Sequence, residues 1–174
     1  AIPSVEAIRL FDDFLVGLAK TGTAVLAVAG NHDSGERLAF GRTFFSTHDI
    51  HIAGVFDGKV NRVVLSDDDG PVTFHLLPFI RPADVRRHFP EKEPGTATEA
   101  VGTALSTSER GEGRQVLITH QFVTCRGEDP LRSDSEVLQI GLADEVDASL
   151  FHGFDYVALG HLHRFQRVGP GPLY

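Results

Sequence analysis

Three short apolar runs that each lead into a histidine constrain this chain more than any other feature. Residues 24–29 run into Gly-Asn-His-Asp, residues 115–119 run into His120, and residues 155–159 run into Gly-His-Leu-His. Continuous apolar runs of this length are typical of strands that are buried on both faces of a sheet. Ligands of open α/β sheets bind beyond the carboxyl ends of the strands. If the three strands are parallel neighbours, their histidines are therefore expected to converge on one rim.

Helical and strand-like segments alternate along the rest of the chain. Ser4 precedes an apolar stripe at helical spacing and Gly22 follows its last turn, which predicts a helix over residues 4–20. Asp57-Gly58 is a hairpin signal between two strand-like segments. The 174 residues form one domain, and the alternation favours an α/β layered fold. The further predictions are helices over 36–45, 82–88 and 96–110, strands over 50–56, 60–65 and 72–77, a helical turn over 148–151, and an exposed loop over 124–135.

Composition excludes several classes of protein. A single cysteine, Cys125, rules out an internal disulfide framework and a cysteine-rich zinc module. The longest apolar run, residues 24–29, is far shorter than the ~20 residues that a bilayer span needs. We therefore expect no membrane attachment and a reduced, cytoplasmic setting. The net charge of −8 argues against a protein that holds nucleic acid mainly by a basic surface, but bound divalent cations can supply positive charge to a nuclease.

The chain contains no methionine and opens at Ala1. This composition predicts a piece of a longer protein, with removal of a lone initiator methionine as the alternative. Both ends are accordingly treated as possible cuts.

The histidine-bearing segments carry the chemistry. Imidazole nitrogens suit zinc, manganese or iron, and the amide oxygen of Asn31 is a hard ligand. Each segment taken alone has an ordinary explanation, since Gly-Asn-His-Asp is rich in turn residues and a histidine after a strand is commonly a core residue. Their coincidence at three strand ends favours a metal or phosphate site. Five histidines lack this setting and are interpreted as structural or surface residues: His48, His51, His75, His88 and His152.

These motifs resemble the later half of the calcineurin-like metallophosphoesterase signature. The likeness is sharpest over residues 29–40, 119–123 and 154–164, which are similar to SbcD-type nuclease subunits. It departs at Phe165, where the family usually has proline, a change expected to affect only local packing. The family begins with Asp-x-His and Gly-Asp-x-x-Asp motifs, and neither is found ahead of the predicted helix 4–20. The resemblance thus implies a partial nuclease domain over residues 1–174, without those motifs and without the capping region that follows the last histidine motif.

The resemblance also implies roles for individual residues. Asn31, His120 and His161 are expected to bind one of two divalent metal ions, most simply Mn²⁺, and His163 the other. His32 is expected to lie over the scissile phosphate and to stabilise or protonate the leaving oxygen, as a general acid in the second case, with Asp33 orienting it. The implied activity of the full-length protein is Mn²⁺-dependent DNA exonuclease and endonuclease cleavage in repair and recombination.

The implied partners are DNA, an SbcC-like coiled-coil ATPase and a second copy of the same protein. Because the upstream ligands are missing, the isolated chain is expected to be inactive or nearly so. Two alternatives remain open. One is a metallophosphoesterase that acts on a phosphoester other than DNA. The other is an inert fragment that only binds its ATPase partner.

Overall fold

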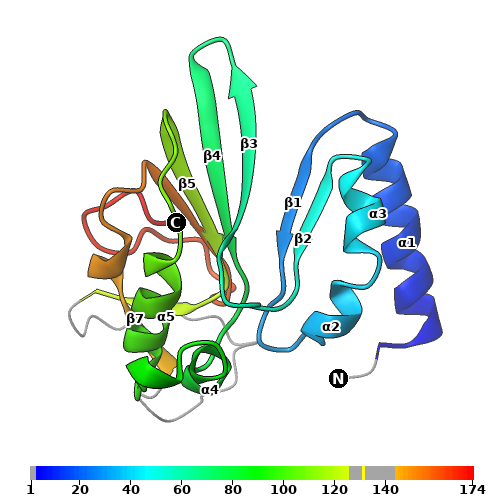
Figure 1. Cartoon of the computed structure of the whole chain (residues 1–174). Coiled ribbons are helices and arrows are strands. Elements are labelled where there is room, and N and C mark those ends of the chain that lie inside the picture. Colours follow the sequence, from blue (N-terminus) through cyan, green and yellow to red (C-terminus); the bar gives the residue numbers. More distant parts are fainter. Residues whose placement is uncertain (1–2, 126–130, 132–143) are drawn as a thin grey trace.

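The computed structural model describes residues 3–125, 131 and 144–174, and these form a mixed α/β structure with two main sheets and helices on their outer sides (Figure 1). This architecture confirms the predicted fold class, mixed sheets flanked by helices. No helix in the described part of the chain is long and apolar enough to cross a membrane.

The first layer consists of a two-stranded parallel sheet covered by helices. Strand β1 (Val25–Val28) pairs in parallel with β2 (Ile50–Ala53). Helices α1 (Val5–Ala19), α2 (Gly35–Leu38) and α3 (Arg42–Ser46) lie on the side of this sheet that faces away from the second sheet (Figure 1). Leu15, Ile50 and Ile52 form the buried cluster that joins helix to sheet.

Local sequence signals set the bounds of these helices. The Ser4 hydroxyl accepts a hydrogen bond from the Ala7 N–H at 3.2 Å, which caps α1 as predicted. The single helix predicted over 36–45 is wrong, because two short helices occupy this region. Gly41 lies between them with φ of 75°, a conformation that a helix cannot contain.

The second layer is a four-stranded mixed sheet in the order β3-β4-β5-β8. Strand β3 (Asn61–Asp67) is antiparallel to β4 (Gly70–Leu77), whereas β5 (Arg114–Thr119) is parallel to both β4 and β8 (Tyr156–Leu159). Apolar side chains of α5 (Ala97–Ser106) pack with β5 and β8 in the main core. The remaining elements are α4 (Pro82–Arg86), the 3-10 turns η1 (Pro90–Lys92) and η3 (Ala148–Phe151), and the parallel pair β6 (Phe122–Thr124) and β7 (Glu145–Asp147).

The hairpin predicted around Asp57-Gly58 is wrong. Strand β2 ends at Ala53 and pairs with β1, while β3 pairs along its whole length with β4 through a turn from Asp67 to Gly70. The reason is burial, because Ile50 and Ile52 find their apolar partners in the α1–α3 layer rather than beside β3. The segment that follows β2 therefore crosses from one sheet to the other.

Two further differences concern the region after β5. The short strands β6 and β7 were not expected from the sequence, since three residues are too few to show a period. Most of the loop predicted over 124–135 lies outside the described residues. The turn predicted over 148–151 is confirmed as a 3-10 turn, with Asp147 Oδ1 accepting from the Ser149 N–H at 2.7 Å.

Candidate metal and phosphoester site

The ends of β1, β5 and β8 meet at one edge of the molecule. The Gly160 N–H donates to the Thr119 carbonyl at 2.9 Å, which fixes the two parallel strand ends side by side. The Phe79 N–H, just beyond β4, donates to the Ala29 carbonyl at 2.9 Å and ties the end of β1 to the same edge. The strands are not all neighbours in one sheet, since β1 belongs to the first layer. The expected convergence nevertheless occurs, across the two layers.

Asn31, His120 and His161 come together at this edge. The Nε2 atom of His120 lies 3.1 Å from Oδ1 of Asn31. The rings of His120 and His161 are 5.5 Å apart between centroids and nearly perpendicular, at 80°. Phe122 packs against His161 at 5.6 Å and so covers one side of the ring. One amide and two imidazoles from three separate segments thus form a single cluster.

Two glycines make room for the His120 ring. A Cβ atom on Gly30 would lie 2.8 Å from Cε1 of His120, and one on Gly160 would lie 2.5 Å from its Nδ1. Both distances are below van der Waals contact, so any side chain at either position would displace the imidazole. Neither glycine has positive φ, so backbone conformation does not require glycine at these positions. The close approach of the His120 ring does.

His161 has an unusual backbone conformation, with φ of 84°. Non-glycine residues seldom adopt positive φ, and such residues cluster at functional sites where surrounding structure holds them in place. The strand pairing before His161 and the contacts of its imidazole with the rings of His120 and Phe122 supply that constraint. The positive φ therefore fixes the direction in which the His161 side chain leaves the end of β8.

The electrostatic setting of His120 favours a neutral ring. Burial lowers the pKa of His120 below its ordinary value, the nearby His161 lowers it further, and Asp33 opposes the change. A histidine with such a pKa is unprotonated near neutral pH, which is the form that binds metal ions.

The other predicted site residues lie around this cluster. His32, Asp33 and His163 follow the same strand ends, and all three are exposed. The Asp33 carboxylate accepts a hydrogen bond from the Gly30 N–H at 2.7 Å and closes the loop after β1. Its contact is therefore with the loop backbone, and a role in orienting His32 stays a prediction. The remaining histidines lie elsewhere, and His75 is buried between Ser108 and Gln115 in the second sheet.

The donor chemistry of the cluster fits one divalent ion, because an amide oxygen and two imidazole nitrogens are suitable ligands for manganese or zinc. Within the described ranges, no group of three or more His, Cys, Asp or Glu side chains is arranged to hold a metal ion. The cluster supplies one amide oxygen and two imidazole nitrogens, and binding of a metal ion there stays a prediction.

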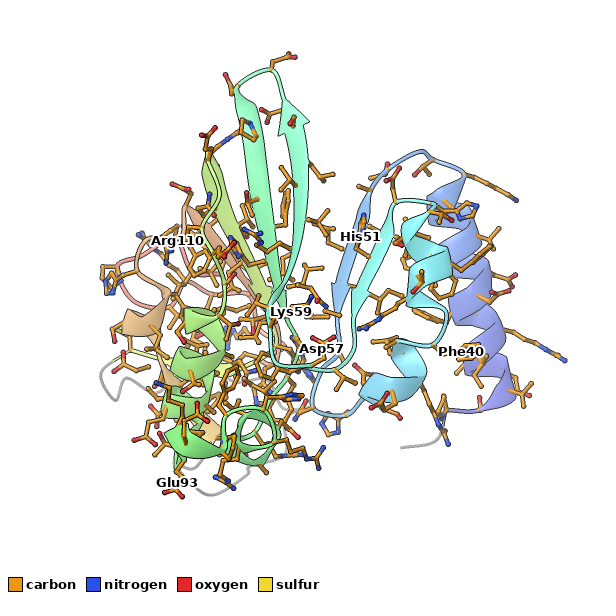
Figure 2. The ribbon with its side chains drawn as sticks, in the orientation of Figure 1. Phe40, His51, Asp57, Lys59, Glu93 and Arg110 are labelled. Atoms are coloured by element: carbon orange, nitrogen blue, oxygen red, sulfur yellow. The ribbon has the colours of Figure 1, made fainter. Side chains whose placement is uncertain are left out.

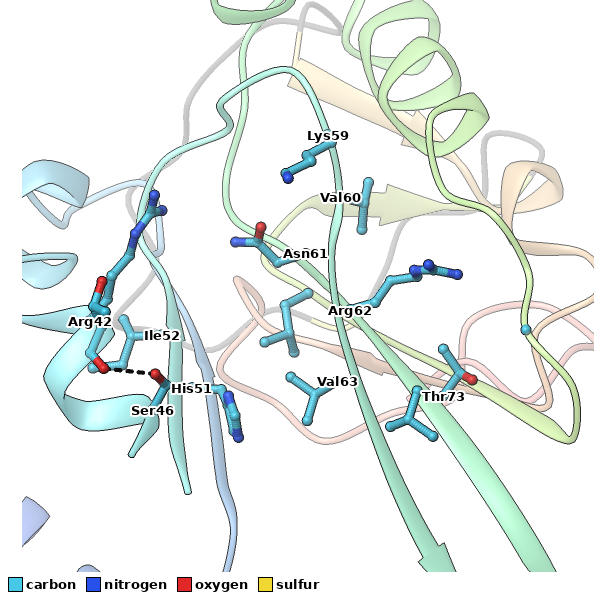
Figure 3. A pocket seen from close by; sticks show the side chains of 14 residues that line it. Arg42, Ser46, His51, Ile52, Lys59, Val60, Asn61, Arg62, Val63 and Thr73 are labelled. Carbon is cyan, nitrogen blue, oxygen red and sulfur yellow. Dashed lines mark hydrogen bonds between the residues drawn. The ribbon is translucent and has the colours of Figure 1, made fainter. Parts of the chain in front are cut away.

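Cavities near the sheets are lined by residues in the described part of the chain. One, of about 610 Å³, opens between β2 and β3 and is lined by His51, Lys59 and Arg62 among others (Figure 3). In its wall the Ser46 hydroxyl donates to the Thr43 carbonyl at 2.8 Å. None of the predicted site residues lines this cavity. Another, of about 330 Å³, is bordered by Gly160 and Leu162, on either side of His161, and by aromatic residues that sequence reasoning did not single out as functional.

Known proteins resemble the chain in sequence. No family model matches it. The SbcD component of the SbcCD nuclease from Staphylococcus epidermidis is 33% identical over 166 residues, which are 92% of this chain and 42% of that protein. The protein of the same name from Staphylococcus saprophyticus is 32% identical over 169 residues, with the same coverage. The chain thus spans less than half the length of these relatives. Over nearly its whole length it is an SbcD-like sequence, and the resemblance predicted from its motifs is confirmed.

Proposed function

We propose that this chain is part of the metal-dependent nuclease domain of an SbcD-type protein, which hydrolyses DNA phosphodiester bonds in repair and recombination. The observation that carries the proposal is the convergence of Asn31, His120 and His161 from three strand ends that are far apart in sequence. The likeness to the two named nuclease components supports the same conclusion.

In this proposal Asn31, His120 and His161 bind one Mn²⁺ ion through an amide oxygen and two imidazole nitrogens. His163, two residues further on and exposed, binds a second ion together with groups outside this chain. When bound, the two cations supply the charge that stabilises the attacking and leaving oxygens of a phosphodiester. The neutral state of His120 keeps its ring nitrogen available as a ligand.

His32 is proposed as the general acid. Its side chain is exposed on the loop that Asp33 closes, next to Asn31 in the sequence, so it can reach a phosphate held beside Asn31, His120 and His161. As the P–O bond breaks, His32 gives its proton to the leaving oxygen. An imidazole suits this step because its ordinary pKa, about 6.5, lies near neutral pH.

The proposed partners rest on the name of the two relatives, which describes them as one component of the SbcCD nuclease. We propose DNA as the substrate, an SbcC-like coiled-coil ATPase as the other component, a homodimeric assembly and a cytoplasmic location. The acidic net charge of −8 fits a nuclease in which bound cations, rather than a basic surface, meet the phosphate.

Calorimetric titration of the 174-residue chain with Mn²⁺ tests the cluster. We expect binding to the wild type, and a large loss of affinity in Asn31→Ala and in His120→Ala. His48→Ala is the matched control, because His48 lies at the end of α3 with only local contacts. Equal affinity in all four chains would refute the proposed ligand set.

Substrate class is tested in a protein of the relatives' full length that carries this segment. Labelled single-stranded DNA and a bis-nitrophenyl phosphate ester are digested side by side with Mn²⁺. Preferential cleavage of DNA supports the nuclease, whereas cleavage of the small ester alone favours the other phosphoesterase. We expect His32→Ala to keep Mn²⁺ binding and lose most hydrolysis, and undiminished hydrolysis would refute its role. The 174 residues alone are expected to show little or no cleavage.

A further inference from the structure

Three aromatic rings form a continuous stack near the cluster of Asn31, His120 and His161. The rings of Phe165 and Tyr174 are 6.0 Å apart between centroids with an interplanar angle of 12°, and those of Tyr174 and Tyr156 are 5.9 Å apart at 14°. Tyr174 is the middle ring. Phe165 is 84% exposed, so one face of the stack is open to solvent.

Backbone contacts hold the stack in place. The Tyr174 N–H donates to the Val157 carbonyl at 3.0 Å, and the Leu159 N–H donates to the Tyr174 carbonyl at 2.6 Å, so the last residues run alongside β8. The turn before them is fixed by Arg167, whose Nε donates to the Gly171 carbonyl at 2.9 Å. The stack is thus attached to the same strand that ends just before His161.

The stack borders the cavity of about 330 Å³ next to His161. The cavity wall also contains Arg164 and Gln121. Arg164 is exposed and forms no ion pair within the described residues, so its charge is available to a phosphate. The buried amide oxygen of Gln121 has no hydrogen-bond partner in the described part of the chain, although its Nε2 donates to the Pro78 carbonyl at 3.1 Å.

From this arrangement we infer that Phe165, backed by Tyr174 and Tyr156, stacks on a nucleobase of single-stranded DNA whose neighbouring phosphate lies at the metal cluster. The inference rests on the proposed function for the identity of the ligand. A planar base matches the open face of an aromatic ring, and such stacking operates without sequence preference because every base has a π-face. An apolar ligand without charge would leave Arg164 unused, and one without N–H donors would leave the Gln121 oxygen unsatisfied.

The composition of the chain supplies a direct probe. It has no tryptophan and only two tyrosines, and both belong to the stack. Intrinsic tyrosine emission therefore reports on this location alone. We would titrate the chain with a short oligothymidylate in EDTA, correcting for absorbance, and compare an abasic oligonucleotide of equal length. We expect quenching by the thymine oligonucleotide and little by the abasic one.

Variants make the test specific. Phe165→Ala should weaken binding of the thymine oligonucleotide about 5- to 150-fold, the range expected for the loss of one stacked base. Phe165→Tyr should retain most of the affinity. Phe40→Ala is the matched control, because Phe40 is 83% exposed and lies just after α2 in the first layer (Figure 2), whereas the stack lies along β8 in the second sheet. Circular dichroism confirms that each variant is folded.

The outcomes separate this inference from the proposed function. Absence of quenching, equal quenching by the abasic oligonucleotide, or unchanged affinity in Phe165→Ala would overturn the stacking role, whatever the Mn²⁺ titration shows. Base-dependent quenching in a chain that binds no Mn²⁺ would support the stacking role and refute the metal cluster. Because the titration is made in EDTA, metal binding has no influence on it.

Discussion

The Nε2 atom of His120 lies 3.1 Å from the Oδ1 atom of Asn31, although the two residues are separated by 89 positions in the sequence. They belong to different sheets, since Asn31 follows β1 and His120 follows β5. The contact therefore depends on how the two layers pack, and it connects the fold directly to the chemistry of the site.

The first prediction concerns the space around His120. Gly160→Ala places a Cβ atom 2.5 Å from Nδ1 of His120, so the ring must leave its position beside Asn31 and His161. We expect Mn²⁺ affinity to fall about 10- to 100-fold, the range seen when groups that orient ligands are removed. Calorimetric titration measures the change.

Gly17→Ala is the control for that variant. Gly17 lies within α1, and no atom lies within 4 Å of a Cβ built there. Alanine is a better helix former than glycine, so this substitution should raise the free energy of unfolding by about 1 kcal/mol and leave Mn²⁺ affinity unchanged. If both variants bind Mn²⁺ like the wild type, a side chain at position 160 does not displace the His120 ring enough to weaken metal binding.

The second prediction separates backbone strain from ligand chemistry at His161. With φ of 84°, this residue stays strained when its side chain is shortened to alanine, but not when it is replaced by glycine. His161→Gly should therefore be more stable than His161→Ala by about 1 to 2 kcal/mol in urea unfolding. Both variants should lose Mn²⁺ binding. Equal stability of the two would mean that the backbone relaxes out of the left-handed region.

The sequence was sufficient to predict the elements whose signals are local. The Ser4 cap and the following apolar stripe predicted α1 within one residue at each end. The apolar runs that precede Gly30, His120 and Gly160 are strands as expected. The ends of β5 and β8 lie together because chain polarity places the carboxyl ends of parallel strands at one edge, and packing of the first layer brings the end of β1 to the same edge. The sequence thus predicted that Asn31, His120 and His161 lie close together, while their role as metal ligands stays a prediction.

Features that depend on the choice between long-range partners were not predictable. The apolar pattern of Ile50 and Ile52 fits either sheet, and only packing against α1 and α3 assigns it to the first. Phe165 was expected to change only local packing. Its stack with Tyr174 joins two segments through a turn whose geometry depends on the Arg167 side chain, which no local pattern encodes.

The third prediction is a loss of stability on mild acidification that depends on His75. This side chain is buried, and its Nε2 donates to Oε1 of Gln115 at 2.9 Å while Nδ1 faces the Ser108 hydroxyl at 2.6 Å. Burial lowers the pKa of His75 below its ordinary value of 6.5. The unfolded chain therefore binds a proton near pH 6.5 that the folded chain does not bind.

Stability from this source is complete above about pH 6.5 and declines as the pH falls toward the lowered pKa of the folded state. Thermal unfolding at pH 7.5 and 5.5 measures the effect. His75→Gln should lose less stability between the two pH values than the wild type, whatever its stability at pH 7.5. His48→Gln, the same substitution at an exposed position, should retain the wild-type difference. An undiminished difference in His75→Gln would assign the acid sensitivity to other groups.

The last prediction concerns the start of α5, the helix that covers the main core. Thr96 and Glu99 form a reciprocal cap: the Glu99 N–H donates to the Thr96 hydroxyl at 3.2 Å, and the Thr96 N–H donates to the Glu99 carboxylate at 3.1 Å. Thr96→Ala removes one half of this cap and should lower the free energy of unfolding by about 1 kcal/mol. Thr103→Ala is the matched control, because its hydroxyl only donates back to the Glu99 carbonyl within the helix. That change should be neutral or slightly stabilising, since alanine has the higher helix propensity. Equal destabilisation by the two variants in urea unfolding would show that loss of a hydroxyl anywhere on α5, rather than loss of its cap, accounts for the effect.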